Sequence, residues 1–283
     1  MNIEIEKQDG SLLLYTAIGF AGGERHIQLT DLAQAEDATL TIRANLMSSN
    51  DVMDLLLIAN ALRHAFGQDL KINLELPYLP YSRQDRVCAE GQAFSLEVMA
   101  SLLKLIRVNE LVTWDCHSKV GIELTQSHNV TPATIIQSDA ALSSLLKHPR
   151  SVLVCPDKGA VERCQDIQQA LNLKAMVFCD KQRNPTTGKI YHTEVLCDDL
   201  TGKCAIISDD ICDGGYTFIK IAEQLRAKNA ERIVLFVTHG IFSKGLGVFD
   251  GLIDEVITTN SLPQKTHSKL SIINFNYTFG ESS

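Results

Sequence analysis

The sequence lacks the long apolar run and the leader that would mark a membrane or secreted protein. Its most apolar stretch, residues 55–62, is far too short to cross a bilayer. The first ten residues are acidic and lack the basic start and apolar core of a signal peptide. We therefore expect no membrane partner and no secretory targeting.

The sequence also lacks paired cysteines. Its eight cysteines lie at positions 88, 116, 155, 164, 179, 197, 204 and 212. None forms a C-x-x-C pair, the common spacing of zinc ligands, and all are scattered among apolar segments. This distribution predicts neither a zinc site nor a disulfide framework, and it favours the reducing cytoplasm.

Positive charge is scarce. Lys and Arg number 26 against 34 Asp and Glu, which gives a net charge of −8 and a pI near 5.5. Proteins that hold nucleic acid by its phosphates present an excess of positive charge, so we expect no nucleic-acid partner. Small anionic ligands are compatible with this balance only if cations are concentrated at one place.

Composition and periodicity indicate a folded α/β protein. Hydrophobic residues make up 45% and charged residues 21% of the 283 residues, which excludes a disordered chain. Short apolar runs alternate with longer segments of helical period, a pattern that predicts parallel sheets with helices on both faces. The expected strands are residues 39–42, 70–76, 110–114, 152–155, 174–178, 205–208 and 232–237, with 270–279 as a candidate final strand. The expected helices are residues 50–66, capped by Asn50, and 95–106, 160–171 and 217–228.

The length fits two domains of ordinary size, since a domain commonly holds roughly 100–200 residues. Residues 129–150 contain Pro132 and Pro149 and separate two stretches that each resemble a complete α/β unit. We place the boundary there, giving domains 1–138 and 139–283. Residues 183–188 include Pro185 and Gly188, which predicts a mobile loop that enters a hairpin or flap over residues 189–196.

The strongest local signal is an apolar strand that runs into carboxylates, glycines and then a helix. Its polar part is Ser208-Asp209-Asp210-Ile211-Cys212-Asp213-Gly214-Gly215-Tyr216-Thr217. Ligands of open α/β sheets bind beyond the carboxyl ends of strands, and the amides at a helix start can receive a phosphate. Because three carboxylates would repel a phosphate, they should face hydroxyl groups or hydrated magnesium. A sugar phosphate satisfies both halves, whereas the alternative is an acidic turn with Asp213 as the helix cap.

Other polar groups follow other predicted strands. Arg83 and Arg86, after the strand at 70–76, could clamp phosphates in a forked geometry, although two arginines near an aspartate more often form a solvated ion-pair surface. Asp115 and His117 follow the strand at 110–114. Residues 157–159 (Asp-Lys-Gly) follow the strand at 152–155, and Lys181 with Arg183 opens the predicted loop. Each motif alone is weak, but four such loops in one register point to a site.

Together these segments resemble the ribose-phosphate pyrophosphokinase family, over about residues 18–262. In chain order they are 20–24 (Phe-Ala-Gly-Gly-Glu), 50–66, 81–86 (Tyr-Ser-Arg-Gln-Asp-Arg), 115–117 (Asp-Cys-His), 155–157 (Cys-Pro-Asp), 180–183 (Asp-Lys-Gln-Arg), 208–217, and 238–243 (Thr-His-Gly-Ile-Phe-Ser). In the same order, these eight segments are similar to eight features of the family. The features are its nucleotide loop, its NDxxMELL helix, the motifs Y-x-R-Q-D-[RK], D-x-H, S-P-D and D-K-x-R, its ribose-phosphate loop, and the motif T-H-G-[VI]-F-S.

The resemblance implies two tandem domains of phosphoribosyltransferase type I, each a mainly parallel sheet flanked by helices. It implies a cytoplasmic homo-oligomer with the active site near a subunit interface. It also implies transfer of the diphosphate of ATP to the anomeric hydroxyl of ribose 5-phosphate, with Mg²⁺, in nucleotide biosynthesis.

The resemblance also implies roles for matching residues. Phe20, Glu24, Arg83 and Gln84 would bind ATP. His117 and Asp157 would lie at magnesium, and Lys181, Arg183 and His117 would be catalytic. The ribose 5-phosphate site would be Asp209, Asp210, Asp213, Gly214, Gly215, Tyr216 and Thr217. Phosphoryl transfer asks mainly for in-line positioning and neutralisation of charge, which a Lys/Arg pair and magnesium can supply.

Two positions depart from the family pattern. Gly22 stands where an aspartate is common, and this affects the purine contact. The usual D-T-A-G-T of the sugar loop is here Asp213-Gly214-Gly215-Tyr216-Thr217, so one hydroxyl ligand for the phosphate is lost and Tyr216 replaces a glycine. Two alternatives to an active transferase stay open: a catalytically silent member that regulates a partner synthetase, and a phosphoribosyltransferase, which leaves the ATP-side motifs unexplained.

Overall fold

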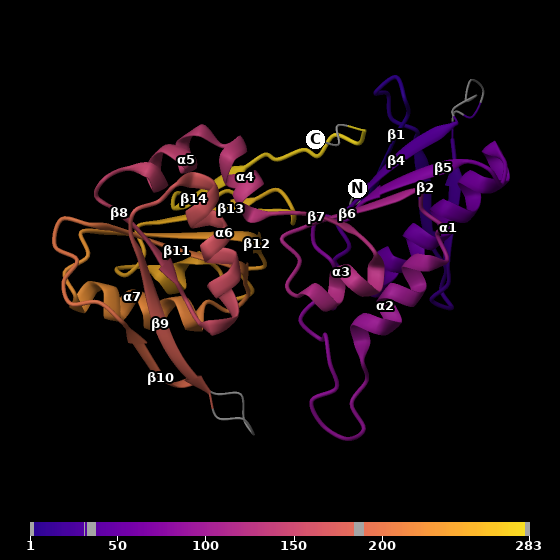
Figure 1. The fold of residues 1–283 in the computed structure, drawn as a ribbon. Coiled ribbons are helices and arrows are strands. Elements are labelled where there is room, and N and C mark those ends of the chain that lie inside the picture. The colour runs from indigo at the N-terminus through magenta and orange to yellow at the C-terminus, as the bar shows by residue number, and fades with distance from the viewer. Residues whose placement is uncertain (1–2, 31, 33–37, 184–189, 281–283) are drawn as a thin grey trace. The chain divides into compact units, whose positions relative to one another are not determined.

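The computed structural model describes residues 3–30, 32, 38–183 and 190–280, with side chains omitted at 181–183 and 190–193. The chain forms two compact units (Figure 1). Unit 1 comprises Met1–Val130 together with Tyr277–Ser283, and unit 2 comprises Thr131–Asn276. The units meet between Val130 and Thr131 in the chain. A compact unit is not by itself an independent domain, so the predicted domain boundary at residue 138 stays a prediction.

Unit 1 is built on a five-stranded sheet in the order β1-β4-β5-β6-β7. Its strands are β1 (Ile3–Glu6), β4 (Thr39–Ala44), β5 (Lys71–Glu75), β6 (Glu110–Trp114) and β7 (His128–Val130). Only β1 runs antiparallel to its neighbour. A separate antiparallel hairpin consists of β2 (Tyr15–Gly19) and β3 (Arg25–Leu29). The helices are α1 (Ser49–Phe66), α2 (Ser95–Lys104) and α3 (Lys119–Thr125).

Helix α1 packs its apolar stripe into the core of unit 1. Leu55, Ile58 and Leu62 are fully buried at three- and four-residue steps, the spacing that keeps side chains on one helix face. The cap is Ser48, whose hydroxyl accepts from the amide of Asp51, so the prediction of Asn50 as cap was wrong. Both residue types favour this position. The cap therefore lies two residues earlier in the chain than predicted.

Unit 2 is built on a seven-stranded sheet in the order β10-β9-β8-β11-β12-β13-β14. Its strands are β8 (Ser151–Cys155), β9 (Met176–Arg183), β10 (Ile190–Val195), β11 (Cys204–Cys212), β12 (Arg232–Gly240), β13 (Glu255–Thr259) and β14 (Leu270–Ile273). Only β10 is antiparallel. The helices are α4 (Pro132–Ser138), α5 (Ala140–Lys147), α6 (Val161–Leu171) and α7 (Tyr216–Ala227), with short 3₁₀ turns η1 (Lys158–Ala160) and η2 (Leu246–Phe249).

The predicted fold class, mainly parallel sheets flanked by helices, is confirmed. Residues 129–150, which separate the two predicted α/β stretches, hold the end of β7 followed by α4 and α5. Pro132 starts α4 rather than interrupting it, since a proline at the first helical position loses no hydrogen bond. The predicted hairpin is present as the antiparallel pair β9–β10, while the predicted loop residues 184–189 lie outside the described part.

The last residues of the described chain return to unit 1. Strand β14 ends at Ile273, short of the expected 279, and the backbone amide of Tyr277 donates to the buried carboxylate of Glu75. The Tyr277 carbonyl accepts from Arg43, which also pairs with Glu75 at 2.9 Å. Within the described residues, no helix is long and apolar enough to cross a membrane.

Candidate functional site

In unit 2, three neighbouring parallel strands bring their carboxyl ends to one edge of the sheet. Strand β11 lies between β8 and β12. The loops that follow these strands contain Asp157, the segment 213–217 and the segment 241–245. Ligands of open α/β sheets bind at this edge, so the topology brings together three of the segments that the sequence singled out.

The sugar-loop carboxylates begin inside β11 rather than after it. The strand continues through Cys212, four residues beyond the predicted end, and Asp209 pairs with Val237 of β12. Pairing to residues as far as Gly240 of β12 keeps this polar stretch extended. Asp209 and Asp210 are therefore held by sheet hydrogen bonds, which fixes their backbone more firmly than a loop would.

A largely buried arginine from α6, Arg163, contacts both of these aspartates. Nη1 of Arg163 lies 3.2 Å from Oδ1 of Asp209, and Nη2 lies 3.7 Å from Oδ2 of Asp210. Only 12% of the Arg163 side chain is exposed. Sequence reasoning missed this residue. One signal could have found it. Arg163 directly precedes Cys164, which with Ile167 belongs to the buried apolar stripe of the helix, so Arg163 lies beside the helix face that packs on the sheet.

Negative charge at Asp209 is only partly compensated. Burial raises the pKa of Asp209 well above its usual value, the neighbouring charges of Asp210 and Asp157 raise it further, and Arg163 opposes them. Asp157 is fixed as the cap of η1, because one of its oxygens accepts from the amides of Gly159 and Ala160. Asp157, Asp209 and Asp210 thus lie at the same edge of the sheet, and Arg163 pairs with the last two of them.

The segment that the sequence predicts to cradle a phosphate lies at the start of α7. Gly215 is the residue before the helix and has φ of 79°, a conformation that favours glycine. A Cβ atom added there would lie 2.7 Å from Cζ of Phe249, so the backbone approaches η2 closely. The first amides of an α-helix have no intrahelical partner, and the helix dipole is positive at this end. Tyr216 begins the helix with 54% of its surface exposed, beside the cradle.

The segment 238–243 holds this cradle by its backbone. The amides of Ile241 and Phe242 donate to the carbonyl of Cys212, and the amide of Ser243 donates to the carbonyl of Asp213. Behind it, the Thr238 carbonyl accepts from the hydroxyls of Thr259 and Ser261. The resemblance alone assigned this motif no role, whereas its contacts identify it as the support of the sugar loop.

In unit 1, the segment 20–24 is the turn of the β2–β3 hairpin. The amide of Phe20 donates to the carbonyl of Glu24, and 55% of Phe20 is exposed. A Cβ atom added at Gly22 would lie 2.5 Å from a carboxylate oxygen of Glu24. The Glu24 carboxylate therefore folds over the place that a side chain at position 22 would take. The hairpin is fixed to α1 by a bidentate pair between Arg25 and Asp54.

Two loops at the carboxyl ends of β5 and β6 lie close together. Burial acts to raise the pKa of Asp85, but the Ser118 hydroxyl, the Arg86 guanidinium and the charge of His117 together lower it. Asp115 is buried with φ of 39°, and the next amide, of Cys116, donates to the Asn129 side chain. This constrained turn leaves His117 exposed. The predicted ATP ligands Arg83 and Gln84 are exposed on the first loop.

The predicted catalytic pair Lys181 and Arg183 lies on β9 rather than in a loop. The strand runs through Arg183 and pairs with β10 in antiparallel fashion. The side chains of both residues lie outside the described part. Asp180, which precedes them, pairs with Lys158 at 3.8 Å. The basic pair therefore stands on one strand of a projecting hairpin whose base joins the sheet.

The predicted residues divide between the two units. Unit 1 carries Phe20, Glu24, Arg83, Gln84 and His117. Unit 2 carries Asp157, Lys181, Arg183 and the sugar loop. The division matches the expected separation into an ATP side and a sugar side, and the individual roles stay predictions.

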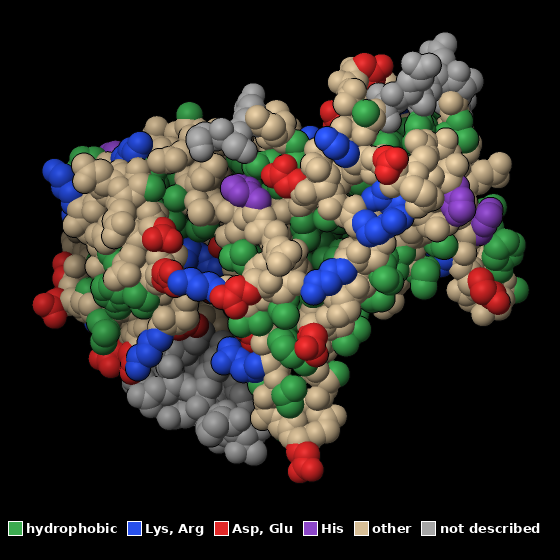
Figure 2. All heavy atoms as spheres, turned by 45° about the vertical axis from the view of Figure 1, so that its right-hand side comes forward, with side chains coloured by type: hydrophobic (Ala, Val, Ile, Leu, Met, Phe, Trp, Pro, Cys, Tyr) green, Lys and Arg blue, Asp and Glu red, His purple; other side chains and the backbone are tan. Residues whose placement is uncertain are grey.

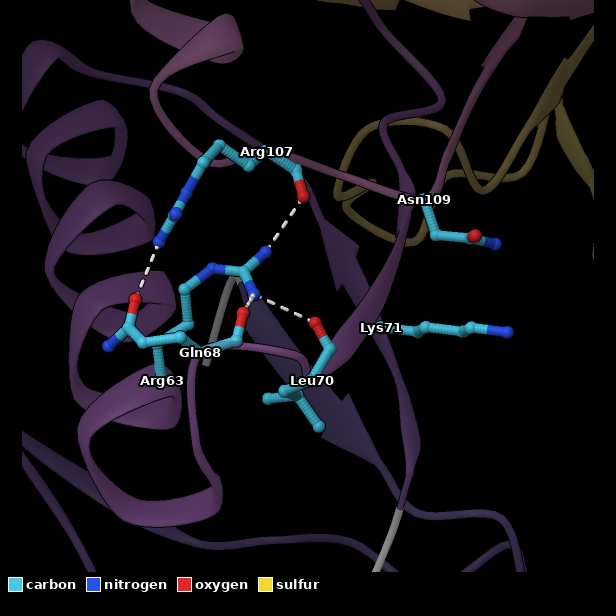
Figure 3. Close-up of a pocket in the computed structure, with 6 residues that line it drawn as sticks. All are labelled: Arg63, Gln68, Leu70, Lys71, Arg107 and Asn109. Carbon is cyan, nitrogen blue, oxygen red and sulfur yellow. Dashed lines mark hydrogen bonds between the residues drawn. The ribbon is translucent and has the colours of Figure 1, made fainter.

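A surface pocket of about 240 Å³ in unit 1 contains none of these residues. It lies where β5 begins and just before β6, at the edge opposite the carboxyl ends of these strands. Figure 3 shows Arg63 at its centre, donating to the carbonyls of Gln68, Leu70 and Arg107. Lys71 and Asn109 point together away from it (Figure 3). The arginine closes the ends of two helices, and the basic groups do not converge on a ligand.

Comparison with known proteins decides the family. The N-terminal domain of ribose phosphate pyrophosphokinase matches residues 5–106, and a phosphoribosyl synthetase-associated domain matches residues 186–281. The ribose-phosphate pyrophosphokinase of Pyrococcus abyssi is 30% identical over 99% of this chain and 91% of its own length. This chain belongs to the ribose-phosphate pyrophosphokinase family. The family member from Haemophilus influenzae is 28% identical over 90% of this chain and 83% of its own.

The fold comparison agrees. The crystal structure of phosphoribosylpyrophosphate synthetase from Mycobacterium smegmatis has a TM-score of 0.77 and 23% identity, covering 93% of this chain and 87% of that one. It confirms the expected fold of two phosphoribosyltransferase-type sheets. The family that the sequence motifs predicted is confirmed by the family models and the similar proteins.

Proposed function

We propose that this chain transfers the diphosphate of ATP to the anomeric hydroxyl of ribose 5-phosphate. The products are 5-phosphoribosyl 1-diphosphate and AMP. The observation that carries the proposal is the loop 209–217, where paired carboxylates on β11 lead directly to glycines and the start of α7. Carboxylates suit the ribose hydroxyls and helix amides suit its phosphate, so one loop matches both ends of the sugar phosphate.

The reaction places modest chemical demands on the protein. A bond forms between the anomeric oxygen and the β-phosphorus of ATP as the hydroxyl loses its proton to solvent, and the bond from that phosphorus to the oxygen that bridges it to the α-phosphorus breaks. The electron pair leaves with AMP. In this assignment Lys181 and Arg183 stabilise the charge that spreads over the transferred phosphates, and His117 lies beside the triphosphate. Their placement on β9 supports a role in which the hairpin presents the pair as a unit.

The ATP side is assigned to exposed groups of unit 1. Phe20 offers an aromatic face for the purine, and Glu24 offers a carboxylate for its amino group. Arg83 and Gln84 would contact the phosphates from the loop after β5. Support comes from the constrained geometry of the hairpin turn and from the anchoring of the hairpin by Arg25.

We also propose Mg²⁺ as the cofactor. Magnesium prefers carboxylate oxygens and usually keeps one or two protein carboxylates plus substrate phosphates, and Asp157 beside the partly compensated charge of Asp209 fits that preference. Among the described residues, no group of three His, Cys, Asp or Glu side chains could hold a metal, so substrate oxygens would complete the shell. When bound, magnesium would neutralise developing phosphate charge, with His117 as a predicted neighbour.

The free cysteines and the surface charges bear on where and with what partners the reaction takes place. All eight cysteines are free thiols, which supports a reducing cytoplasm. Acidic and basic side chains are interspersed on the face that Figure 2 shows, which suits small substrates better than nucleic acid. We propose a homo-oligomer whose active site lies near a subunit interface, and a product used in nucleotide biosynthesis.

The direct test uses purified protein with MgCl₂, ATP and ribose 5-phosphate. AMP release is followed while each component is omitted in turn, and phosphorus NMR identifies the product. AMP that appears only in the complete mixture, with a diphosphate on the anomeric carbon, supports the proposal. Binding of either substrate without AMP release would instead favour the regulatory-subunit alternative, and a need for a free base would favour a phosphoribosyltransferase.

A further inference from the structure

The phosphate cradle of this chain carries an electrostatic problem. Asp209, Asp210 and Asp213 lie on the approach to a site for a phosphate dianion, in a protein of net charge −8. At position 214 there is no side chain to donate a hydrogen bond. The helix amides contribute only partial charge, so a full positive charge close to the cradle would offset the repulsion.

Most cations near the loop already have acidic partners. Arg163 is shared between Asp209 and Asp210. Lys220, one turn into α7, pairs with Glu223 at 2.7 Å. Neither adds a full uncompensated charge at the start of the helix.

Lys244 differs from both. It follows Ser243 at the tip of the loop after β12, where the amide of Gly245 donates to the carbonyl of Phe242 and closes a tight turn. A Cβ atom added at Gly214 would lie 3.7 Å from Cγ of Lys244 and 4.0 Å from Oγ of Ser243. The lysine stem therefore borders the open space above Gly214. Lys244 is exposed and forms no ion pair with any carboxylate in the described part of the chain.

We propose that Lys244 binds the 5-phosphate of the sugar, with the Ser243 hydroxyl beside it. The assignment rests on the proposed function of the loop 209–217. The ammonium is three bonds beyond Cγ on a flexible stem, and its three donors adapt to a phosphate without a fixed fork geometry. In this chain a charge from the next loop would do the work of the hydroxyl that is missing at Gly214.

The backbone makes the pairing of the two loops reliable. The amide of Ser243 donates to the carbonyl of Asp213 at 3.2 Å, so the residue before Lys244 is tied to the residue before Gly214. A charge delivered by such a fixed loop loses less conformational freedom on binding than one on a free segment.

The test measures AMP release by the full chain at saturating MgATP while ribose 5-phosphate is varied. Lys244→Ala should raise KM for ribose 5-phosphate about tenfold, the usual contribution of one charge-assisted hydrogen bond, with kcat within about twofold. KM for ATP should not change. Lys244→Arg should restore most of the loss, and Lys244→Glu should exceed the loss of the alanine variant.

Lys203→Ala is the matched control, because it removes the same charge from unit 2 at the opposite end of β11. It should leave KM for ribose 5-phosphate unchanged. An unchanged KM in Lys244→Ala, or an equal rise in both alanine variants, would overturn the assignment and leave Lys244 as a solvated surface residue. If the wild-type chain releases no AMP, calorimetric titration with ribose 5-phosphate still compares the two alanine variants, so failure of the reaction and failure of this assignment are distinguishable.

Discussion

At Asp209, burial and two neighbouring carboxylates oppose ionisation, so its native pKa lies above the unfolded value near 3.8. Between these two values the folded chain binds more protons than the unfolded chain. Stability therefore falls as the pH rises through that window. Asp209→Asn removes the cost of holding a charged carboxylate at this position. We therefore expect the melting temperature of the variant at pH 7.5 to exceed that of the wild type by about 2–4 °C.

Differential scanning calorimetry across pH checks this expectation. The gain should shrink as the pH falls and vanish below about pH 4, where the wild-type carboxyl is protonated in both states. The same substitution should weaken ribose 5-phosphate binding, since function requires the charge that stability disfavours. A variant less stable than the wild type at pH 7.5 would contradict the argument.

Arg163 is expected to act as a positioning residue for the two carboxylates of β11. Arg163→Gln leaves Asp209 and Asp210 without their shared cation, so we expect KM for ribose 5-phosphate to rise about tenfold while KM for ATP stays near the wild-type value. The free energy of unfolding should fall by about 3 kcal/mol, as when one partner of a buried ion pair is removed. Arg163→Lys should recover only part of the lost affinity and stability, because an ammonium lacks the planar fork whose two Nη atoms each reach one carboxylate.

Steady-state kinetics and urea unfolding measure both effects. Arg232→Gln provides the comparison, since Arg232 pairs with Glu255 in a partly exposed position at the start of β12. That change should cost less than about 1 kcal/mol and leave KM unaltered. Equal behaviour of the two glutamine variants would show that the contact to Asp209 does not position the sugar site.

The residues found from sequence and those missed differ in how they are placed. Asp209, Asp210 and Asp213 follow an apolar run directly, so strand geometry predicts their edge of the sheet. Arg163 reaches the same edge from a helix 46 positions earlier. Lys244 reaches it from the loop of a neighbouring strand. Neither has a local pattern that names its partner, because both contacts depend on the strand order of the sheet.

At the scale of elements, the close approach of α7 and η2 limits what can stand at Gly215. A Cβ atom there would lie 2.7 Å from Cζ and 2.9 Å from Cε1 of Phe249, at a φ of 79°. We expect Gly215→Ala to lower the free energy of unfolding by about 2 kcal/mol, since backbone strain and overlap add. Gly214→Ala should cost less, because its nearest neighbour is at 3.7 Å.

Urea unfolding of the two single variants decides this, and a double variant identifies the cause. Phe249→Leu provides space beside position 215, so Gly215→Ala should cost less in that background than alone. Additive losses would mean that φ alone, and not contact with η2, excludes the alanine.

The predictability of the elements follows from how completely each is buried. Strands β5 and β6 are buried at every position except the first, and their predicted bounds agree with the structure to within one residue. The end of β11 was missed because the apolar run is interrupted by Asp209 and Asp210, although pairing with β12 keeps the chain extended to Cys212. The β2–β3 hairpin was missed because β2 is largely exposed and carries no apolar alternation.

At the scale of the molecule, each unit has its own buried core and its own set of predicted ligands. Leu55, Ile58 and Leu74 belong to the first core, while Val154, Ile207 and Leu235 belong to the second. The sequence indicated two α/β units because the alternation of elements occurs twice. The return of Tyr277 to unit 1 was not predictable, since it depends on hydrogen bonds to Glu75 and Arg43 that no local pattern encodes.

Separate cores allow each substrate to be assigned to a unit by experiment. A ligand stabilises the unit that binds it, in proportion to the occupancy of its site. In hydrogen-exchange mass spectrometry, saturating ribose 5-phosphate alone should slow exchange in peptides of β11 and the start of α7. The nucleotide with MgCl₂ should slow exchange in the hairpin turn at 20–24 and the loops at 81–86 and 115–118.

Protection of α7 by both ligands, or of the hairpin by the sugar phosphate, would contradict this division. The Asp209→Asn variant tests the sugar half independently, because it should reduce protection by ribose 5-phosphate while leaving protection by the nucleotide intact. Loss of both patterns in that variant would place the nucleotide on the carboxylates of β11. The two-unit assignment of substrates thus depends on contacts that exchange can resolve peptide by peptide, whatever the rate of the reaction.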